Sequence, residues 1–369
     1  MRPSADVIVI GGGIIGCATA CELARRGAKV RVFEARTVAA GATHASAGML
    51  APYIEAHDRG PLFDLTLRSL DLFDDFVARA VDDSGLSVDY RRTGSLEIAT
   101  DAVIADTLRQ RACTQRDGAL QWLSPHAARE LEPALPETIH GAVYVPTHGY
   151  VAVSALTEAL AWAALKHGAE IETGRDIQSI ARGADHIHVT ADDGTTWIAP
   201  TVVMAAGSWS SQIATADPAA AGVKPIRGQL LRLAWKGAPL SRVLWGHDCY
   251  IVPWQDGTVL VGATVEDAGF DSRTTAAGVQ SLLASACALL PSASDATFVE
   301  ARAGLRPATA DGLPIIGRSA QIDGLVYATG HYRNGILLAP LTAAIVADLI
   351  VDGREDPALA MTAPGRIPS

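Results

Sequence analysis

The chain has 369 residues, of which 49% are hydrophobic and only 19% charged, which excludes a disordered chain and predicts a compact soluble enzyme of two domains or one interleaved domain. A formal net charge of -10 without a basic stripe argues against a nucleic-acid partner. The cysteines are odd in number and scattered, so we expect reduced thiols; with a first strand close to the N-terminus and no signal sequence, this points to the cytoplasm.

The first stretch predicts the start of a dinucleotide-binding unit. Val7–Ile10 is a β-branched run typical of a buried parallel strand. Gly11, Gly13 and Gly16 then form G-x-G-x-x-G, which allows a tight turn, a close approach of backbone to a pyrophosphate, and close packing of the next helix. The N-terminus of that helix offers N–H groups to phosphates.

The unit closes on an acidic residue. The helix Ile14–Arg26 ends at Gly27, and a second strand runs from Val30 to Glu34. A carboxylate there can accept hydrogen bonds from the ribose hydroxyls of an adenine nucleotide and would repel the 2′-phosphate of NADP. The pattern leaves FAD and NAD open.

Two features follow the second strand. Residues 39–50 are mostly small, so the backbone can pass close to a flat or polyanionic ligand with the hydroxyls of Thr43 and Ser46 available, although a flexible loop is the alternative. Residues 61–81 have the periodicity of an amphipathic helix and are expected in the core.

The middle of the chain alternates strands and helices. We expect a strand pair around Gly94 within residues 88–100, a helix over 101–118, and a helix capped by Ser124. Strands at 141–144 and 149–154, the helix 155–167 and the strand 170–172 suggest that the nucleotide domain resumes here.

A β-rich half comes next. Residues 187–190 and 197–199 read as a hairpin, and His186 and His188, which could suggest a metal, lack further ligands and are better explained as a surface pair. Residues 201–207 predict another buried strand, with a helix starting at 208, and residues 223–267 predict a separate antiparallel sheet.

The last segment repeats the strand, Gly-rich turn and helix pattern of the first segment. A strand at 325–327 leads into a Gly-rich turn and the helix Ile336–Val351. This helix is apolar, but it contains Pro340 and Asp348 and is shorter than the about 20 residues needed to cross a membrane. We expect a buried helix whose N-terminus faces a cofactor.

At this point the chain resembles a known family, the glycine oxidase and D-amino-acid oxidase group of FAD-dependent amine oxidases, and within it the bacterial glycine oxidases of thiamine synthesis. Besides the first unit, the blocks that carry the likeness are Thr43–Met49, Val202–Gly207, His247–Pro253, Ala303–Pro307 and Gly330–Pro340. The last two are the most specific, and the likeness covers nearly the whole chain.

The resemblance implies a Rossmann-like FAD-binding domain interleaved with an antiparallel-sheet substrate domain. The expected division assigns residues 1–84, 150–222 and 300–369 to the first and residues 85–149 and 223–299 to the second. A tetramer is also implied. Sarcosine-oxidase relatives hold FAD on a cysteine, but no cysteine follows Cys287, so non-covalent FAD is expected.

The same resemblance assigns the cofactor residues by position. They are Gly11, Gly13, Ile14, Ile15, Gly16, Glu34, Ala35, Ala42, Thr43, Ala47, Gly48, Met49, Ile177, Gly207, His331, Tyr332, Arg333, Asn334, Gly335, Ile336 and Leu337.

For the substrate it implies that Arg306 binds the carboxylate, helped by Tyr250 and Arg333. The assignment makes chemical sense, because a guanidinium grips a carboxylate with two hydrogen bonds and the hydride goes to the cofactor, so no side-chain base is required. The alternatives are a structural ion pair for Arg306, neutralisation of the reduced flavin for Arg333, and a core role for Tyr250.

Two departures from the family bear on the substrate range. Val265 stands where glycine oxidases carry methionine, and Tyr332 where they carry phenylalanine; both are expected near the pocket. We therefore expect an FAD oxidase that converts glycine, sarcosine and small D-amino acids with molecular oxygen. Its products from glycine would be glyoxylate, ammonia and hydrogen peroxide. A D-amino-acid dehydrogenase that reduces a quinone, another secondary-amine oxidase, and a non-catalytic flavin-binding subunit remain alternatives.

Overall fold

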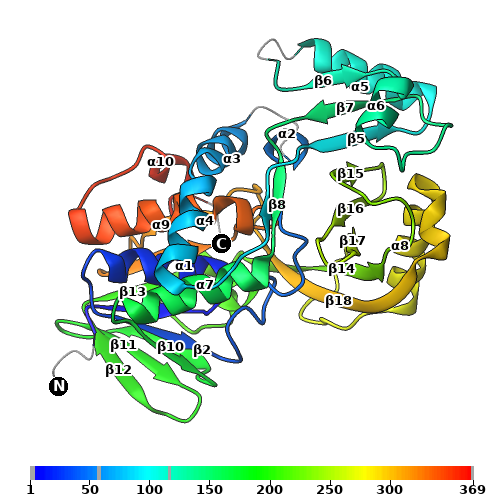
Figure 1. The fold of residues 1–369 in the computed structure, drawn as a ribbon. Helices are drawn as coiled ribbons and strands as arrows, with labels where there is room; N and C mark the ends of the chain where they lie inside the picture. The colour runs from blue at the N-terminus through cyan, green and yellow to red at the C-terminus, as the bar shows by residue number, and fades with distance from the viewer. Residues whose placement is uncertain (1–4, 56–59, 115–117, 367–369) are drawn as a thin grey trace.

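The computed structural model describes residues 5–55, 60–114 and 118–366. Two large sheets organise the molecule. In the view of Figure 1 the parallel sheet and its helices lie on the left and the antiparallel sheet on the right.

The parallel sheet grows outward from the first strand of the chain. Its order is β19-β20-β13-β1-β2-β9, and all neighbours run parallel except β19, which is antiparallel to β20. The bounds are β1 Val7–Ile10, β2 Val30–Glu34, β9 Glu170–Thr173, β13 Thr201–Met204, β19 Ile315–Arg318 and β20 Leu325–Thr329. The β-branched run of β1 is buried throughout, as expected for a central strand.

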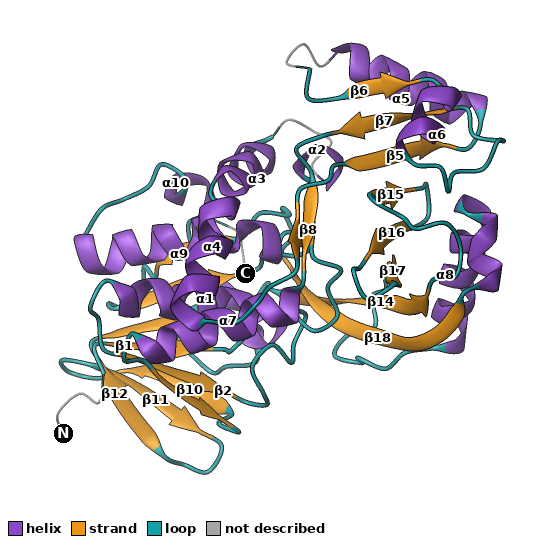
Figure 2. Ribbon diagram, viewed as in Figure 1, coloured by secondary structure: helices purple, strands orange, loops and turns teal. Residues whose placement is uncertain are grey.

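Helices cover one face of this sheet and a small antiparallel sheet lies over the other (Figure 2). Helix α1 packs against both α7 and α9, and α9 also packs against α3. The helices are α1 Ile14–Arg25, α3 Pro61–Asp71, α4 Phe73–Ser84, α7 Val153–Lys166 and α9 Gly335–Ala347, and the small sheet is β10 Ile177–Arg182, β11 Ile187–Ala191 and β12 Thr196–Ala199. Each face therefore has its own apolar core.

The apolar C-terminal helix belongs to the core. Within the described residues Gly335–Asp352, which includes a π-helical end over Asp348–Asp352, is the one helix long and apolar enough to span a membrane, but 67% of it is buried inside the fold. Its packing against α1 and α3 accounts for its composition.

The antiparallel sheet has the order β18-β14-β17-β16-β15-β5-β7-β6, with one parallel pair between β15 and β5. Its strands are β5 Ser95–Ala99, β6 Gln121–Leu123, β7 Gly141–Val145, β14 Lys224–Ala234, β15 Val243–Trp245, β16 Tyr250–Pro253, β17 Thr258–Gly262 and β18 Thr297–Ala308. Helices α5 Ala102–Thr114, α6 Pro125–Leu131 and α8 Ala276–Leu289 pack on it, with the 3₁₀ turn Pro291–Asp295.

Short elements connect the two halves. A small sheet of order β3-β8-β4 brings together Met49–Leu50, Gly149–Val151 and Tyr90–Arg91. The short helix α2, Pro52–Glu55, follows β3. The remaining elements are the 3₁₀ turns Gly207–Ser211 and Pro218–Ala220 and the helix α10 Leu359–Thr362.

The mixed fold class is confirmed, and three local predictions need correction. Residues 88–100 do not form a hairpin, because β4 pairs with β8 whereas β5 pairs with β7 and β15. Gly94, at φ +80, turns the chain from one sheet to the other, and its N–H donates to the carbonyl oxygen of His148 at 3.0 Å. The helix of residues 61–81 is interrupted at Leu72, and the helix at residue 208 is only a 3₁₀ turn.

Two other predictions meet the edges of the described structure. The helix over 101–118 is α5, which ends at Thr114, and residues 115–117 lie outside the described residues. The division into two domains stays a prediction, and β18 crosses its expected boundary at residue 300.

Candidate active site

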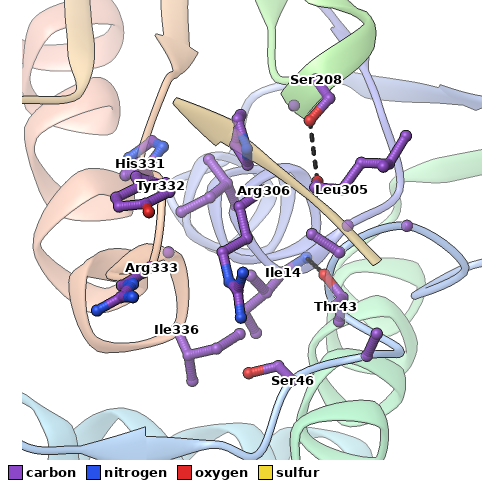
Figure 3. Close-up of a pocket in the computed structure, with 18 of the residues that line it drawn as sticks. Ile14, Thr43, Ser46, Ser208, Leu305, Arg306, His331, Tyr332, Arg333 and Ile336 are labelled. Carbon is purple, nitrogen blue, oxygen red and sulfur yellow. Dashed lines mark hydrogen bonds between the residues drawn. The ribbon is translucent and has the colours of Figure 1, made fainter. Parts of the chain in front are cut away.

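A cavity of about 560 Å³ lies between the two sheets and is lined by residues from both. The β1–α1 turn, the end of β2, the loop before β3 and the N-terminus of α9 contribute from the parallel half, and β16, β17 and β18 contribute from the antiparallel half. Figure 3 shows Arg306 between the segment 331–336 on one side and Ile14 and Thr43 on the other.

The glycines of the first turn are required by close approaches. A Cβ on Gly11, at φ +112, would lie 2.4 Å from the carbonyl oxygen of Ala205. A Cβ on Gly16 would lie 1.8 Å from the carbonyl oxygen of Gly11. Gly16 therefore lets α1 sit against the strand, and it does not itself line the cavity.

The acid at the end of β2 is held by main chain. The N–H of Gly12 donates to Glu34 Oε2 at 2.6 Å, and the N–H of Arg36 donates to Oε1 at 2.8 Å. On the other side of the turn the N–H of Ile14 donates to Thr43 Oγ1 at 3.2 Å. These hydrogen bonds connect the turn, the acid and the loop of small residues along one side of the cavity.

The structure gathers the expected cofactor residues, which come from distant parts of the chain. Apart from Gly16, every one of them lines the cavity, from Gly11 at the first turn to Leu337 in α9. Their individual contacts with a cofactor remain a prediction.

Arg306 reaches the cavity from β18 and lies flat over β14. A Cβ on Gly228 would lie 2.2 Å from Cζ of Arg306, so only glycine leaves room for the guanidinium. Arg306 Nη1 donates to the carbonyl oxygens of Thr264 at 3.0 Å and Arg227 at 3.4 Å. One nitrogen is thus held by main chain while the rest of the fork stays available to the cavity.

Tyr250 approaches from β16. Its hydroxyl lies over Gly262, where a Cβ would be 2.2 Å away, and its ring centroid is 5.2 Å from that of Trp245. Burial raises the pKa of Tyr250 to about 12 despite the opposing charge of Arg306, so the hydroxyl stays protonated and can donate.

Arg333 faces an acidic residue across the cavity. Its Nη1 lies 3.6 Å from Glu55 Oε2 on α2. Burial, the largest single influence, would lower the pKa of Arg333, but the Glu55 carboxylate together with Tyr332 and Tyr250 outweighs burial and raises that pKa. The preceding Tyr332 has φ 48, and its N–H donates to the carbonyl oxygen of Pro307 at 2.8 Å, which fixes the turn that presents Arg333.

His331 is neutral. It is buried, burial lowers its pKa to about 3, and its Nε2 lies 3.0 Å from the Thr342 hydroxyl. At neutral pH it can exchange hydrogen bonds but carries no charge.

The sequence missed several lining residues. Glu55, Trp209, Gln212 and Trp245 line the cavity although no motif includes them. Trp245 lies two positions before the motif that begins at His247, and this closeness was the one sequence signal for it. No sequence signal pointed to Glu55. Val265, expected near the pocket, does not line it and has a side chain that is 52% exposed.

Comparison with known proteins identifies the family. The family model described as "FAD dependent oxidoreductase" matches residues 6–349. The chain belongs to that family. Its residues fit FAD, because a glycine turn without Cβ atoms, a carboxylate held by main chain and a long loop of small residues all face one cavity.

Two curated relatives match nearly all of the chain. Glycine oxidase from Geobacillus kaustophilus is 37% identical, over 94% of this chain and 92% of the relative. The bifunctional protein ThiO/ThiG of a Nostoc strain is also 37% identical, over 96% of this chain, but the chain spans only 54% of that relative's length.

Two solved structures superpose on nearly the whole chain. The crystal structure of the Geobacillus kaustophilus glycine oxidase superposes with a TM-score of 0.92 at 34% identity, covering 100% of both chains. Iminodiacetate oxidase from a Chelativorans species superposes with a TM-score of 0.88 at 28% identity, covering 97% of this chain and 98% of that one.

Proposed function

We propose that this member of the FAD-dependent family is an amine oxidase that deaminates glycine, with sarcosine and small D-amino acids as further substrates. With molecular oxygen as acceptor, glycine, water and oxygen give glyoxylate, ammonia and hydrogen peroxide. The observation that carries the proposal is Arg306, whose guanidinium is held on one side by main-chain carbonyls and shares its cavity with the protonated Tyr250.

In this proposal the protein's part is to bind and orient. Arg306 grips the substrate carboxylate with two hydrogen bonds, and the Tyr250 hydroxyl donates a third. Bound FAD supplies the hydride acceptor. The chain positions the substrate carbon for that transfer, and no side-chain base is needed if the amine enters neutral.

Residues of the first turn, Glu34 and the loop before β3 would hold the adenosine and diphosphate of FAD, and residues 331–337 would hold the ring system. Glu34 is suited to the ribose because both its oxygens are already oriented by main-chain N–H groups. The 37% identity to a glycine oxidase over most of both chains supports this interpretation.

The pocket also suggests a second substrate class. An iminodiacetate oxidase is 28% identical, and a second arginine, Arg333, faces the same cavity as Arg306. A second carboxylate could reach it. The Glu55 carboxylate 3.6 Å from Arg333 favours substrates with a single carboxylate instead.

The relatives suggest a place for the reaction. The name ThiO/ThiG links oxidase relatives to thiamine proteins, so we propose that the product enters thiazole synthesis in the cytoplasm. We further propose a homo-tetramer with non-covalent FAD.

A visible spectrum followed by a peroxide-coupled assay over glycine, sarcosine, D-alanine, D-proline and iminodiacetate tests these assignments. We expect a yellow protein with the highest kcat/KM on glycine. Reduction of the flavin by these amines without peroxide would indicate a dehydrogenase, and no reduction would indicate a non-catalytic subunit.

Arg306→Ala is the decisive variant. Losing a bidentate contact to a carboxylate should raise KM for glycine about a hundredfold while FAD stays bound. Arg306→Lys, which keeps the charge but not the fork, should fall between the two. Unchanged steady-state kinetics in Arg306→Ala would remove this residue from the site.

A further inference from the structure

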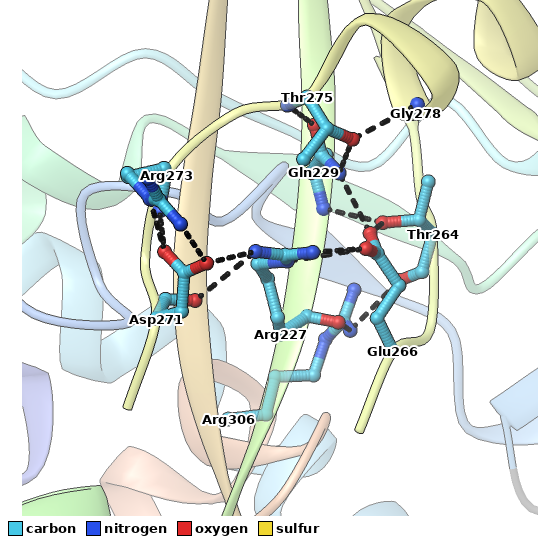
Figure 4. A network of polar contacts seen from close by, with 9 residues as sticks. All are labelled: Arg227, Gln229, Thr264, Glu266, Asp271, Arg273, Thr275, Gly278 and Arg306. Atoms are coloured by element: carbon cyan, nitrogen blue, oxygen red, sulfur yellow. Dashed lines mark hydrogen bonds and ion pairs between the residues drawn. The ribbon is translucent and has the colours of Figure 1, made fainter. Parts of the chain in front are cut away.

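A polar network beside Arg306 joins β14 to the segment that follows β17 (Figure 4), and none of its members lines the cavity. Strand alternation separates the two faces, since Arg306 pairs with Ile226 in the β14–β18 ladder and lies over Gly228, while Arg227 and Gln229 point the other way. The members of the network are Arg227, Gln229, Thr264, Glu266, Asp271, Arg273 and Thr275.

One carboxylate is the centre of this network. Glu266 Oε2 accepts hydrogen bonds from Arg227 Nε at 3.1 Å and Nη2 at 2.6 Å. Its Oε1 accepts from Gln229 Nε2 at 2.7 Å and from the Thr264 hydroxyl at 2.5 Å. The donors Arg227 and Gln229 are only 7% and 0% exposed, whereas the Glu266 side chain is 28% exposed, so the donors are withdrawn from water while the carboxylate is half-buried.

Main-chain hydrogen bonds also connect β14 to the segment 264–266. After β17 ends at Gly262, Arg227 and Glu266 exchange both N–H···O bonds at 2.9 Å. The N–H of Gln229 donates to Thr264 Oγ1 at 2.8 Å, and the N–H of Thr264 donates to the carbonyl oxygen of Gln229 at 3.2 Å. The segment 264–266 is therefore fastened to β14 from both main chain and side chains.

The fastened segment supplies the hydrogen-bond acceptors for Arg306. Both carbonyl oxygens that accept from its Nη1, those of Thr264 and Arg227, belong to residues that Glu266 holds. Without the carboxylate, only the main-chain bonds and the bond from the N–H of Gln229 to Thr264 Oγ1 would hold the segment 264–266 against β14. The guanidinium would then be less firmly oriented, although it would keep both of its bonds to the carbonyl oxygens.

We propose that Glu266, together with Arg227, is a positioning residue that orients the Arg306 guanidinium toward the substrate carboxylate. This rests on the proposed function, in which Arg306 binds that carboxylate. Neither residue lines the cavity, and Glu266 acts through the carbonyls of Thr264 and Arg227.

The charge state of Glu266 agrees with this role. Burial by itself would raise its pKa, but hydrogen bonds from Thr264, Gln229 and Arg227 outweigh burial and lower that pKa. The carboxylate is therefore ionised throughout the working range of an amine oxidase.

A purely structural role is the competing explanation. Gln229 Nε2 also donates to Thr275 Oγ1 at 3.0 Å, and Thr275 caps helix α8 by accepting from the N–H of Gly278 at 3.2 Å. If the network only fastens α8, removing Glu266 should lower the melting temperature without changing how the cavity binds a carboxylate.

The test uses the FAD-loaded protein and glycolate, in which a hydroxyl replaces the amine of glycine. Glu266→Gln keeps the shape and removes the charge. We expect it to raise the Kd of glycolate, measured from the flavin absorbance, and the KM of glycine about tenfold, with FAD affinity unchanged.

The matched control is Glu300→Gln. Glu300 lies on β18, pairs with Arg302 and Arg232, has a side chain that is 37% exposed and does not line the cavity. It should leave the glycolate Kd unchanged. An equal rise in both variants would overturn the proposal.

A double-mutant cycle with Arg306→Ala separates positioning from general damage. Because Glu266 acts through Arg306, Glu266→Gln should have no further effect on glycolate binding in the Arg306→Ala background. The same factor in both backgrounds would overturn the proposal. If Arg306→Ala itself left the glycolate Kd unchanged, the proposed function would fail with it, whereas an effect of Arg306→Ala with none of Glu266→Gln overturns the positioning role alone.

If Glu266→Gln does not fold, Thr264→Val tests the same proposal. It keeps the β-branched shape and removes the hydroxyl that joins Glu266 to the N–H of Gln229. We expect a rise of about threefold in the glycolate Kd. A lowered melting temperature with an unchanged Kd would assign the network to structure only.

Discussion

At the scale of single residues, the cavity places a neutral hydroxyl beside a permanent cation. Tyr250 stays protonated because burial raises its pKa to about 12, although the charges of Arg306 and Arg333 act in the opposite direction. The tyrosine can therefore donate a hydrogen bond to a carboxylate and cannot act as a base near neutral pH. The pH dependence of the reaction should then come from the substrate amine.

Tyr250→Phe tests this assignment. Loss of one hydrogen bond to a carboxylate should lower kcat/KM for glycine about tenfold at every pH. The rise of kcat/KM between pH 7 and about 10, as the amine loses its proton, should keep its shape because a group with a pKa of about 12 does not titrate there.

Tyr144→Phe is the control, since Tyr144 lies on β7 and does not line the cavity. A descending limb between pH 8 and about 10 that is present in the wild type and absent in Tyr250→Phe would show that the tyrosine ionises in that range. That result would contradict the assigned protonation state.

At the scale of elements, a buried histidine ties the connecting segments together. His148, between β7 and β8, has Nδ1 2.7 Å from the Ser95 hydroxyl on β5 and accepts at Nε2 from the N–H of Tyr53 on α2 at 3.3 Å. It is fully buried. Burial, with smaller effects from Arg92 and Arg111, lowers its pKa to about 3.

This contact makes stability depend on pH. The folded pKa lies below the unfolded one, so the stabilisation is present above about pH 6.5 and is lost as the pH falls toward the folded value, because only the unfolded chain takes up the proton. Between pH 7 and pH 5 His148 should account for about 2 kcal/mol of lost unfolding free energy, and the similarly buried His331 for a comparable amount.

Urea denaturation of His148→Gln at several pH values measures this contribution. The variant should be less stable at pH 7 but should lose about 2 kcal/mol less than the wild type on going to pH 5. His126→Gln, at a site 84% exposed on α6, should keep the wild-type pH dependence. Identical slopes for His148→Gln and the wild type would contradict a neutral buried histidine.

Local sequence patterns correctly predicted those elements whose partners are near in sequence. The strand, turn and helix of residues 7–25 and the hairpin of β11 and β12 follow from periodicity, glycines and the Asp-Gly turn. The segment around Gly94 failed because its two strands pair with β8 and β7, which lie about 50 residues later. No local pattern distinguishes such a crossing from a hairpin.

The residues of the candidate site also divide into those that local motifs or the resemblance predicted and those that only the fold brings together. Glycine motifs and the resemblance pointed to the turn, to Glu34 and to Arg306, all of which line the cavity. Glu55 was not predicted, since its importance comes only from the fold, which brings the end of the short helix α2 opposite Arg333. The network around Glu266 was missed for the same reason, because its members meet across β14 and the segment after β17.

At the scale of the whole molecule, the cavity joins segments that are otherwise far apart in the chain. Its lining runs from Ile10 to Leu337 and draws on both sheets, so a ligand that fills it contacts the parallel and antiparallel halves together. Binding to the folded state alone must stabilise that state by mass action. The FAD-binding family to which the chain belongs supplies the ligand for this test.

Removing FAD should therefore lower the melting temperature of the whole chain. At a free FAD concentration of about 100 times Kd the folded state gains about 2.7 kcal/mol, which corresponds to about 3 °C for a chain of this size. Because the cavity is shared, the unfolding of both halves should shift together in calorimetry. NADH at the same concentration should give no shift.

Glu34→Ala shows whether the acid at the end of β2 contributes to that stabilisation. The variant also loses acceptors for the N–H groups of Gly12 and Arg36, so the relevant quantity is the difference in melting temperature with and without FAD, taken within each variant. A tenfold weaker Kd would reduce this difference by about 2 °C. Glu158→Ala, at an exposed position on α7, should retain the full difference. Retention of the full difference in Glu34→Ala would mean that the ribose is held elsewhere, and the cavity would then have to bind FAD without the carboxylate that the N–H groups of Gly12 and Arg36 orient.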